Sequence, residues 1–522
     1  MSAIVGLATN RPDRSVSPRP AETPAGSAFL IWFASIGGSL ALAALFAAHQ
    51  ATLLRVAVPA VATAIAASLY FRRPIGYIHF TLWTWFVTPF IRRVIDWRFS
   101  FEDQSLVLLA PFLVTAIAGL TVLREGRKAR GLQLTPYLLC AAGILYGFFV
   151  GIIRWELHSS AAESVGSIIY GLFLWLAPLL FGLHLHLRWQ SYEAQKSAIL
   201  NSFKWGVLIL GVYGIYQYAA PPAWDCAWLE GLPGGYETNS FGRPFPYEIR
   251  VWSTLNSPGT FAAMMLPGLV LLTLTKTKIK PVVAAAGFGA FLLSLVRTGW
   301  LAWILAMLLL GISQRSAILR KFLLILLLLP LCFIPVCFIP QFRQTIEDRV
   351  STMTDLDHDG SLNDRKRMYE VVTSELFKAP SGEGLLNGST FGVDDMPLDS
   401  GLIQTALMLG FIGTALYAAG ILSCIAGMVR RRNWREGPTD EFAGACRVIF
   451  LAMIAELIGS NVFINFFGCM LWAFYGLWAG SRALAEQASP LALTSRVHLR
   501  SLIPNSSVAL QSSLQDQLWN ER

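Results

Sequence analysis

The chain has 522 residues, of which 54% are hydrophobic and only 14% are charged, and these proportions exclude a soluble multidomain protein. The formal net charge of +9 does not by itself indicate nucleic acid binding, because basic cytoplasmic loops give this excess in multispanning membrane proteins. The seven cysteines show no CxxC spacing and the seven histidines are scattered, so we expect neither a disulfide framework nor a metal site.

In chain order, residues 1–27 are rich in Pro, Ser and Arg and lack an apolar core, which predicts a disordered cytoplasmic tail and not a signal peptide. Apolar runs then follow at 28–48, 53–71, 74–91, 105–123, 134–153, 164–187, 199–217, 258–275, 281–296, 299–313, 322–339, 401–428, 446–462 and 464–482. We therefore predict an all-α polytopic membrane protein with about 12–14 transmembrane helices.

These runs divide the chain into alternating membrane and loop regions. The predicted regions are N-terminal transmembrane helices at 28–217, a periplasmic loop at 218–256, further transmembrane helices at 257–339, a large periplasmic loop at 340–400, C-terminal transmembrane helices at 401–482 and a cytoplasmic tail at 483–522. Five basic clusters fall on one side of this arrangement, at 124–130, 188–196, 276–280, 315–321 and 430–435. By the positive-inside rule that side is cytoplasmic, as are both termini. Arg92 and Arg93 are exceptions, either because they snorkel or because the third span is misplaced.

Arg297 is the lone charge between Pro281 and Ile312. An arginine at membrane depth is costly unless it is buried in protein or faces water, so it indicates a functional site. If the chain reverses at 297–299, each leg has roughly 16 residues and rises roughly 24 Å, which is less than the hydrocarbon layer of about 30 Å. We expect Arg297 to lie in a sunken cavity that binds an anionic group such as a lipid-linked phosphate.

The loop at 218–256 combines aromatic and charged side chains. Its aromatic residues are Trp224, Trp228, Tyr236, Phe241, Phe245, Tyr247 and Trp252, and its charged residues include Asp225, Glu230, Arg243 and Arg250. Aromatic faces beside charged groups suit sugar rings. An interfacial aromatic belt with ordinary surface charges explains the same composition, and both interpretations stay open.

The loop at 340–400 contains Asp355, Asp357 and Asp359, which imitate the start of an EF-hand, but Lys366 occupies the position that needs a glutamate. The following residues predict an amphipathic helix that opens with a capping pattern at 361–364 and stops before Pro380. Gly382 and Gly384 then form a turn. Arg365, in the first turn of that helix, either enters the cavity or is an ordinary surface charge.

Asp399 stands at the mouth of the next helix, where its carboxylate can act as a general base on an acceptor hydroxyl or as the helix N-cap. Gln404 lies one turn further along that helix. Glu456 is near mid-membrane in the predicted topology, with Asn461 and Asn465 after it. A structural ion pair with Arg55 or Lys204 is one role for Glu456, and part of a proton path is another.

Four segments resemble the bacterial O-antigen ligase and polymerase family. They are RVWSTLNSPGTFAAMMLPG, SLVRTGWLAWILAMLLLG, NDRKRMYEVVTSELFKAPSGEGL and LDSGLIQTALMLGFIG, which together span roughly residues 240–425. Arg297 stands at the position of the family's arginine. Ligases of the family carry a histidine where this chain has Asp399-Ser400, which is more similar to the polymerase and exopolysaccharide members.

The resemblance implies a metal-independent glycosyltransferase in the bacterial inner membrane that polymerises undecaprenyl-pyrophosphate-linked repeat units, for exopolysaccharide or O-antigen, at the periplasmic face. It implies Arg297 and Asp399 as catalytic residues, with Arg250, Arg243, Arg365, Trp252 and Gln404 as substrate-binding residues. The implied partners are the lipid-linked glycan, the bilayer, and chain-length regulator and export proteins, with no cofactor and no nucleic acid. A ligase is the alternative within this class. A glycolipid transporter or flippase is the alternative from another class, in which Arg297 and Glu456 line a translocation path.

Overall fold

The computed structural model describes residues 33–126, 132–158, 165–233, 241–314, 377, 380–385, 400–430 and 440–501. These residues are almost entirely helical and contain no β-strand, which confirms the predicted all-α class for this part of the chain. The helices of the first half are α2 (Gly38–Ala47), α3 (Ala51–Arg72), α4 (Pro74–Arg98), α5 (Leu109–Ala116), α6 (Gly119–Glu125), α7 (Thr135–His158), α8 (Val165–Leu187), α9 (Tyr192–Ala219) and α10 (Ala223–Gly231). Those of the second half are α12 (Pro258–Leu274), α13 (Lys280–Leu293), α14 (Arg297–Gln314), α18 (Gly401–Val429), α20 (Glu441–Ala455) and α21 (Asn465–Ser501). Short helical turns add η1 (Phe33–Gly37), η2 (Leu106–Leu108), η4 (Trp189–Ser191) and η6 (Glu456–Ile458).

Six helical stretches of this region are long and apolar enough to cross a membrane, which makes the chain a multi-pass membrane protein. They are Ala51–Arg72, Leu106–Glu125, Thr135–Glu156, Val165–Leu187, Trp189–Ala219 and Gly401–Val429. Shorter apolar helices include α12, α13 and the apolar part of α14, and of these α12 is almost wholly buried. The total of about 12–14 spans and the orientation stay predictions.

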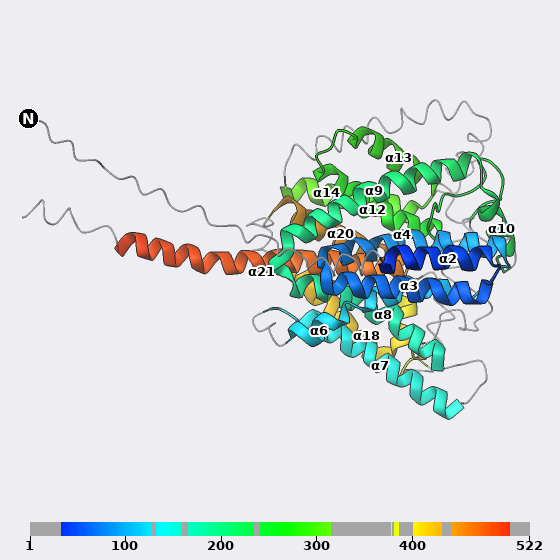
Figure 1. Cartoon of the computed structure of the whole chain (residues 1–522). Coiled ribbons are helices and arrows are strands. Elements are labelled where there is room, and N and C mark those ends of the chain that lie inside the picture. The colour runs from blue at the N-terminus through cyan, green and yellow to red at the C-terminus, as the bar shows by residue number, and fades with distance from the viewer. Residues whose placement is uncertain are drawn as a thin grey trace, which may run out of the picture.

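Helix pairs that are distant in sequence form the bundle (Figure 1). α21 packs along α8, α18 packs along α7, and α13 packs along α9. A Cβ on Gly182 of α8 would lie 2.3 Å from the Trp472 carbonyl oxygen of α21, so the two backbones touch. A Cβ on Gly143 of α7 would lie 2.6 Å from the Gly413 carbonyl oxygen of α18. Small residues at crossings permit the close backbone approach on which helix association in membranes depends.

The segment 380–385 inserts between α7, α8 and α18. α18 is broken at Gly410, which has φ 62° and ψ −175°. The carbonyls of Leu407 and Met408 therefore bond outside their own helix, at 2.7 Å to the Glu383 N–H and 3.1 Å to the Gly384 N–H. Both Gly382 and Gly384 have positive φ, as the predicted glycine turn requires.

Several helices extend beyond their predicted limits. α4 continues to Arg98, and it buries Arg92 and Arg93 within the protein. Neither predicted explanation, snorkelling or a misplaced span, is therefore needed for these two arginines. α21 continues through Ser501, into the region predicted as a polar tail from residue 483, and it projects away from the bundle (Figure 1). The predicted tail at 1–27 and the predicted amphipathic helix with Arg365 lie outside the described residues.

Candidate active site

A cavity of about 440 Å³ opens among the first turns of several helices. Its lining combines amides and hydroxyls with aromatic rings from α4, α5, α8 and α21. The polar lining residues are Asn256, Thr260, Gln404, Ser460, Asn461 and Asn465, and the aromatic ones are Trp85, Phe112, Tyr170, Phe466 and Phe467. Ligand cavities typically combine an apolar wall with a few convergent polar groups.

Three helix N-termini line this cavity. Thr260 lies in the first turn of α12, where Ser257 is the N-cap and its Oγ accepts from the Thr260 N–H at 3.1 Å. Gln404 lies in the first turn of α18, and Asn465 begins α21. N-terminal turns present unpaired N–H groups and the positive end of the helix dipole, so the cavity is electrostatically suited to an anion.

The two amides on the α18 side are held by each other. The Asn461 Nδ2 donates to the Gln404 Oε1 at 3.0 Å, and the Asn461 Oδ1 accepts from the Phe463 N–H at 3.0 Å. On the α12 side, the Asn256 Oδ1 is buried and has no hydrogen-bond partner within the described part of the chain. Buried carbonyl oxygens without partners are uncommon, so a ligand hydroxyl is a natural donor to Asn256.

The predicted reversal near Arg297 is present. α13 ends at Leu293 and α14 begins at Arg297, so the turn is 294–296, just before the predicted position. The ring centroids of Phe288 and Trp303 are 5.1 Å apart, and the Trp300 Nε1 donates to the Phe291 carbonyl at 3.1 Å. Along these two contacts the residue numbers rise on α13 and fall on α14, so the two helices are antiparallel, as in a helical hairpin.

Arg297 starts α14 beside the rim of the cavity. Its side chain is half-buried and is not itself part of the cavity lining. The next residue, Thr298, lies against the rim, because a Cβ on Gly459 would be 3.3 Å from the Thr298 Cγ2. Gly459 lines the cavity, so the N-terminus of a fourth helix meets the same site.

Arg250, predicted to bind substrate, contacts the turn before Arg297. Its Nε donates to the Ser294 carbonyl and its Nη2 to the Leu295 carbonyl, both at 3.1 Å. Leu295 has φ 53°, a left-handed conformation that is unfavourable for a branched side chain. Arg250 therefore clamps the strained turn that precedes Arg297.

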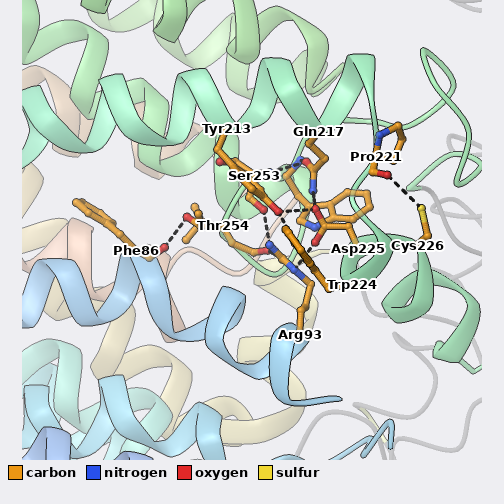
Figure 2. A network of polar contacts seen from close by, with 12 residues as sticks. Phe86, Arg93, Tyr213, Gln217, Pro221, Trp224, Asp225, Cys226, Ser253 and Thr254 are labelled. Atoms are coloured by element: carbon orange, nitrogen blue, oxygen red, sulfur yellow. Dashed lines mark hydrogen bonds and ion pairs between the residues drawn. The ribbon is translucent and has the colours of Figure 1, made fainter. Parts of the chain in front are cut away.

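A buried ion pair supports the segment that carries Arg250 (Figure 2). The Arg93 Nε lies 2.8 Å from the Asp225 Oδ1, and both side chains are fully buried. The Asp225 Oδ2 accepts from Tyr213 at 2.8 Å and from the Gln217 Nε2 at 2.7 Å. The pair joins α4 to α10, with further support from α9.

The same network fixes the backbone at 252–255. Arg93 donates to the carbonyls of Ser253 and Leu255, and the Gln217 Oε1 accepts from the N–H groups of Trp252 and Ser253. Ser253 has φ 55°, a second strained non-glycine residue. The chain passes from this anchored segment to Asn256 and then to α12, so the network sets one wall of the cavity.

The other predicted residues are distributed between core and surface. Trp252 is fully buried, with its ring centroid 5.3 Å from that of Phe241 and 5.8 Å from that of Trp228, so its ring packs inside the protein. Arg243 is exposed on the loop surface. Ser400, and not Asp399, is the N-cap of α18. Asp399 and Arg365 lie outside the described residues.

Glu456 does not form the predicted ion pairs with Arg55 or Lys204. Arg55 pairs with Asp96 at 3.1 Å and with Glu102 at 2.9 Å, and Lys204 lies over the Trp205 ring. The physical reason is position: Arg55 is on α3 beside α4, whereas Glu456 ends α20 in a turn next to α14 and α18. Glu456 is buried, and its Oε1 has no hydrogen-bond partner within the described segments.

The sequence did not identify three elements of this site. Asn256 and Thr260 precede and follow a Ser-Pro pair, which is a strong helix-start signal that could have placed them at a helix mouth. Gly459 lies in the break between α20 and α21, but it falls inside the predicted apolar run 446–462. Asp225 looked like an external charge, because only the tertiary structure shows its arginine partner.

Comparison with known proteins gives one family match. Residues 281–418, about a quarter of the chain, match the family described as O-Antigen ligase. The match begins at α13 and ends within α18, so it includes Arg297, Asp399 and Gln404, and it confirms the predicted resemblance to the O-antigen ligase and polymerase proteins. A search of curated proteins finds no match.

Proposed function

We propose that this chain, which carries the O-antigen ligase family segment at 281–418, is a membrane glycosyltransferase that polymerises undecaprenyl-pyrophosphate-linked oligosaccharide units at the periplasmic face of the bacterial inner membrane. The product is an exopolysaccharide or an O-antigen. Membrane and glycan chemistry are common to the family, whereas the polymerase activity is the specific part of the proposal.

The convergence of four helix N-termini on one cavity carries the proposal. Those of α12, α18 and α21 line it, and that of α14 touches its rim through Thr298 and Gly459. Two of the four helices, α14 and α18, belong to the family segment. Helix N-termini and an arginine stabilise a pyrophosphate, and amides with aromatic rings suit the sugar attached to it.

In the proposed reaction, an acceptor sugar hydroxyl attacks the anomeric carbon of the donor. The new glycosidic C–O bond forms as the bond between that carbon and the pyrophosphate oxygen breaks, and the lipid pyrophosphate leaves with the electron pair. Asp399 takes the hydroxyl proton. Arg297 and the helix N-termini stabilise the charge that grows on the leaving group.

The other residues position substrate and protein groups. Gln404 and Asn461 hold donor hydroxyls in the cavity, and Arg250 acts on the turn before Arg297 instead of on phosphate. Glycan ligation to a second acceptor is the competing function, and the description of the matched family as O-Antigen ligase favours it. Asp399-Ser400 favours polymerisation, because ligases of the resembled family carry a histidine there.

The test is a reconstitution of the purified full-length chain with lipid-linked repeat units alone. Growth of a ladder of longer lipid-linked glycans supports polymerase activity. If glycan transfer occurs only when a second acceptor is added, the result supports ligase activity instead of polymerase activity. No transfer under either condition, together with movement of the glycolipid across vesicles, overturns the enzyme proposal in favour of transport.

A further inference from the structure

A second polar cavity, of about 120 Å³, lies at the other end of the same helices. α8, α18 and α21 contribute Tyr170, Gln404 and Asn465 to the active-site cavity near their N-terminal ends. The same three helices contribute His186, Arg430 and Arg482 to the second cavity, toward their C-terminal ends or, for α21, further along. The two cavities are therefore separated by most of the length of α8 and α18.

Two guanidinium groups from different helices border this second cavity. Arg430 follows the last residue of α18 and is exposed, and Arg482 of α21 is half-buried. The Arg482 Nη2 lies 3.5 Å from the Glu486 Oε1, and Glu486 borders the same cavity. Guanidinium groups match phosphate oxygens in geometry and charge, and one carboxylate leaves a place for a cationic group beside the phosphate.

A buried imidazole forms part of the wall. His186 is 3% exposed, and its Nδ1 has no hydrogen-bond partner within the described segments. The rings of Tyr475 and Trp478 lie beside it and are also buried. A polar nitrogen this deep without a partner points to a missing ligand atom in the cavity.

The start of α7 adds a favourable dipole. Leu132 and Gln133, which lie three and two residues before the start of this 24-residue helix at Thr135, line the cavity. The N–H groups of its first turn have no partners inside the helix, and the helix dipole is positive at this end. Together with the arginines and the histidine, this makes three separate features that favour an anion.

We propose that this cavity binds the phosphate group of a phospholipid headgroup, and that it anchors the ends of α8, α18 and α21 to the leaflet opposite the active site. The volume admits a headgroup but not acyl chains. Arg430 and Arg482 bind the phosphate, His186 completes its hydrogen bonds, and Glu486 faces the ammonium of phosphatidylethanolamine. Basic pockets between transmembrane helices are known positions for lipid headgroups.

The experiment measures lipid retention by native mass spectrometry on the purified full-length chain. It compares phosphatidylethanolamine, phosphatidylcholine and inorganic phosphate as probes. The test variant is R430Q with R482Q, and the matched control is K276Q with K278Q, which removes the same charge from an exposed connection between α12 and α13. We expect the test variant to bind phosphatidylethanolamine about tenfold more weakly or worse, and the control to bind within about twofold of the unaltered chain.

If R430Q/R482Q fails to fold, lipid retention is measured on R430Q alone. This single change should be tolerated, because Arg430 is exposed at the end of a helix. Arginine-dependent binding of inorganic phosphate without lipid retention supports the same phosphate site with a free anion as its source. Equal lipid retention by both variants and the unaltered chain, with no arginine-dependent phosphate binding, overturns the proposal. The glycan reaction is not measured in this experiment, so its outcome is independent of the proposed enzyme activity.

Discussion

Three residues of the site region, Ser253, Leu295 and Asn465, adopt left-handed backbone conformations, and an arginine holds each of the first two. Arg93 donates to the Ser253 carbonyl, and Arg250 donates to the Leu295 carbonyl. A non-glycine residue in this conformation costs about 1–3 kcal/mol, and it persists only when its surroundings fix it. These arginines therefore act on the backbone that places the reacting groups.

The role of Arg250 is tested by a rescue. R250Q removes the clamp, so we expect glycan chain growth to fall about tenfold, which corresponds to strain in the range of about 1–3 kcal/mol. Adding L295G removes the steric cost at φ 53° and should restore more than half of the lost rate. If L295G recovers nothing, Arg250 contacts the substrate instead, and kcat and KM measured separately will show which step is lost.

The buried pair Arg93–Asp225 makes a stability prediction. D225N leaves the Arg93 charge buried without a carboxylate, so we expect a loss of about 3–5 kcal/mol in unfolding free energy. E102Q is the matched control, because Glu102 is 40% exposed at its side chain and pairs with Arg55 nearer to solvent. That change should cost less than about 1 kcal/mol. Thermal unfolding in detergent ranks the two, and equal midpoints would contradict the assigned difference.

In the proposed mechanism, Arg297 takes part in the chemistry itself. R297K keeps the charge but cannot present two parallel donors to a phosphate, so we expect chain growth to fall about tenfold to a hundredfold. R73K, an exposed arginine between α3 and α4, is the control and should keep the parent rate. The rate of repeat-unit incorporation measures both, and a normal rate and polymer length in R297K would remove Arg297 from the proposed mechanism.

At the scale of elements, the break in α18 is the most consequential feature. Gly410 interrupts the helix, and the segment 380–385 supplies the backbone donors that the interrupted helix lacks. The segment also reaches α7, because Arg154 pairs with Glu383. One stretch of the family segment is thus held by a helix from the N-terminal half.

This crossing makes a prediction about glycine. A Cβ on Gly384 would lie 2.4 Å from the Gly151 Cα, and Gly384 has φ 88°, so G384A should destabilise the fold severely, by more than about 4 kcal/mol. G289A is the control within α13, where the nearest atom would be 3.5 Å from the new Cβ. Alanine there should be neutral or slightly stabilising. Yield and thermal midpoint in detergent separate the two cases.

The sequence predicted helices and turns better than it predicted which residues contact one another in the fold. Apolar runs, the Pro-Gly turn at 380–384 and the hairpin at Arg297 follow from local rules of length, charge and glycine content, and the structure has helices or turns at those that fall on its described residues. The predicted run at 322–339 lies outside them. The roles of Trp252 and Arg250 did not follow from the sequence. An aromatic residue in a polar loop looks the same whether it faces sugar or core, and the Arg250 partners are carbonyls about 45 positions away. Such long-range pairings leave no periodic signal.

For the whole molecule, two ion pairs show which loop regions share one end of the helices. Arg188 pairs with Glu125 at 3.1 Å, and Lys196 pairs with Asp440 at 2.8 Å, so three predicted cytoplasmic regions meet at one end. The strained turns and the loop with Arg243 lie at the other end of the helices. The side of the membrane that each end faces stays a prediction.

Orientation is tested directly by thiol labelling of intact cells. F245C, on the exposed loop, should react with a membrane-impermeant maleimide, and K278C, between α12 and α13, should react only after the cells are opened. Labelling of the parent chain measures the background reaction of the native cysteines. Burial, with Asp225 and Glu230 nearby, raises the pKa of the Cys226 thiol, so little reactive thiolate forms there near neutral pH. The reverse labelling pattern would place the proposed active site in the cytoplasm.

The crossing of 380–385 with α7 and α8 bears on how such enzymes can be recombined. Gly151 and Gly171 lie in the half of the chain outside the family match, yet Gly384 and Leu385 need their bare backbones. A chimera that grafts residues 281–418 onto another N-terminal scaffold would meet side chains at those two points and fail to close. The matched segment is therefore not structurally self-contained, and exchange of this segment between related proteins must carry both halves of the glycine contact together.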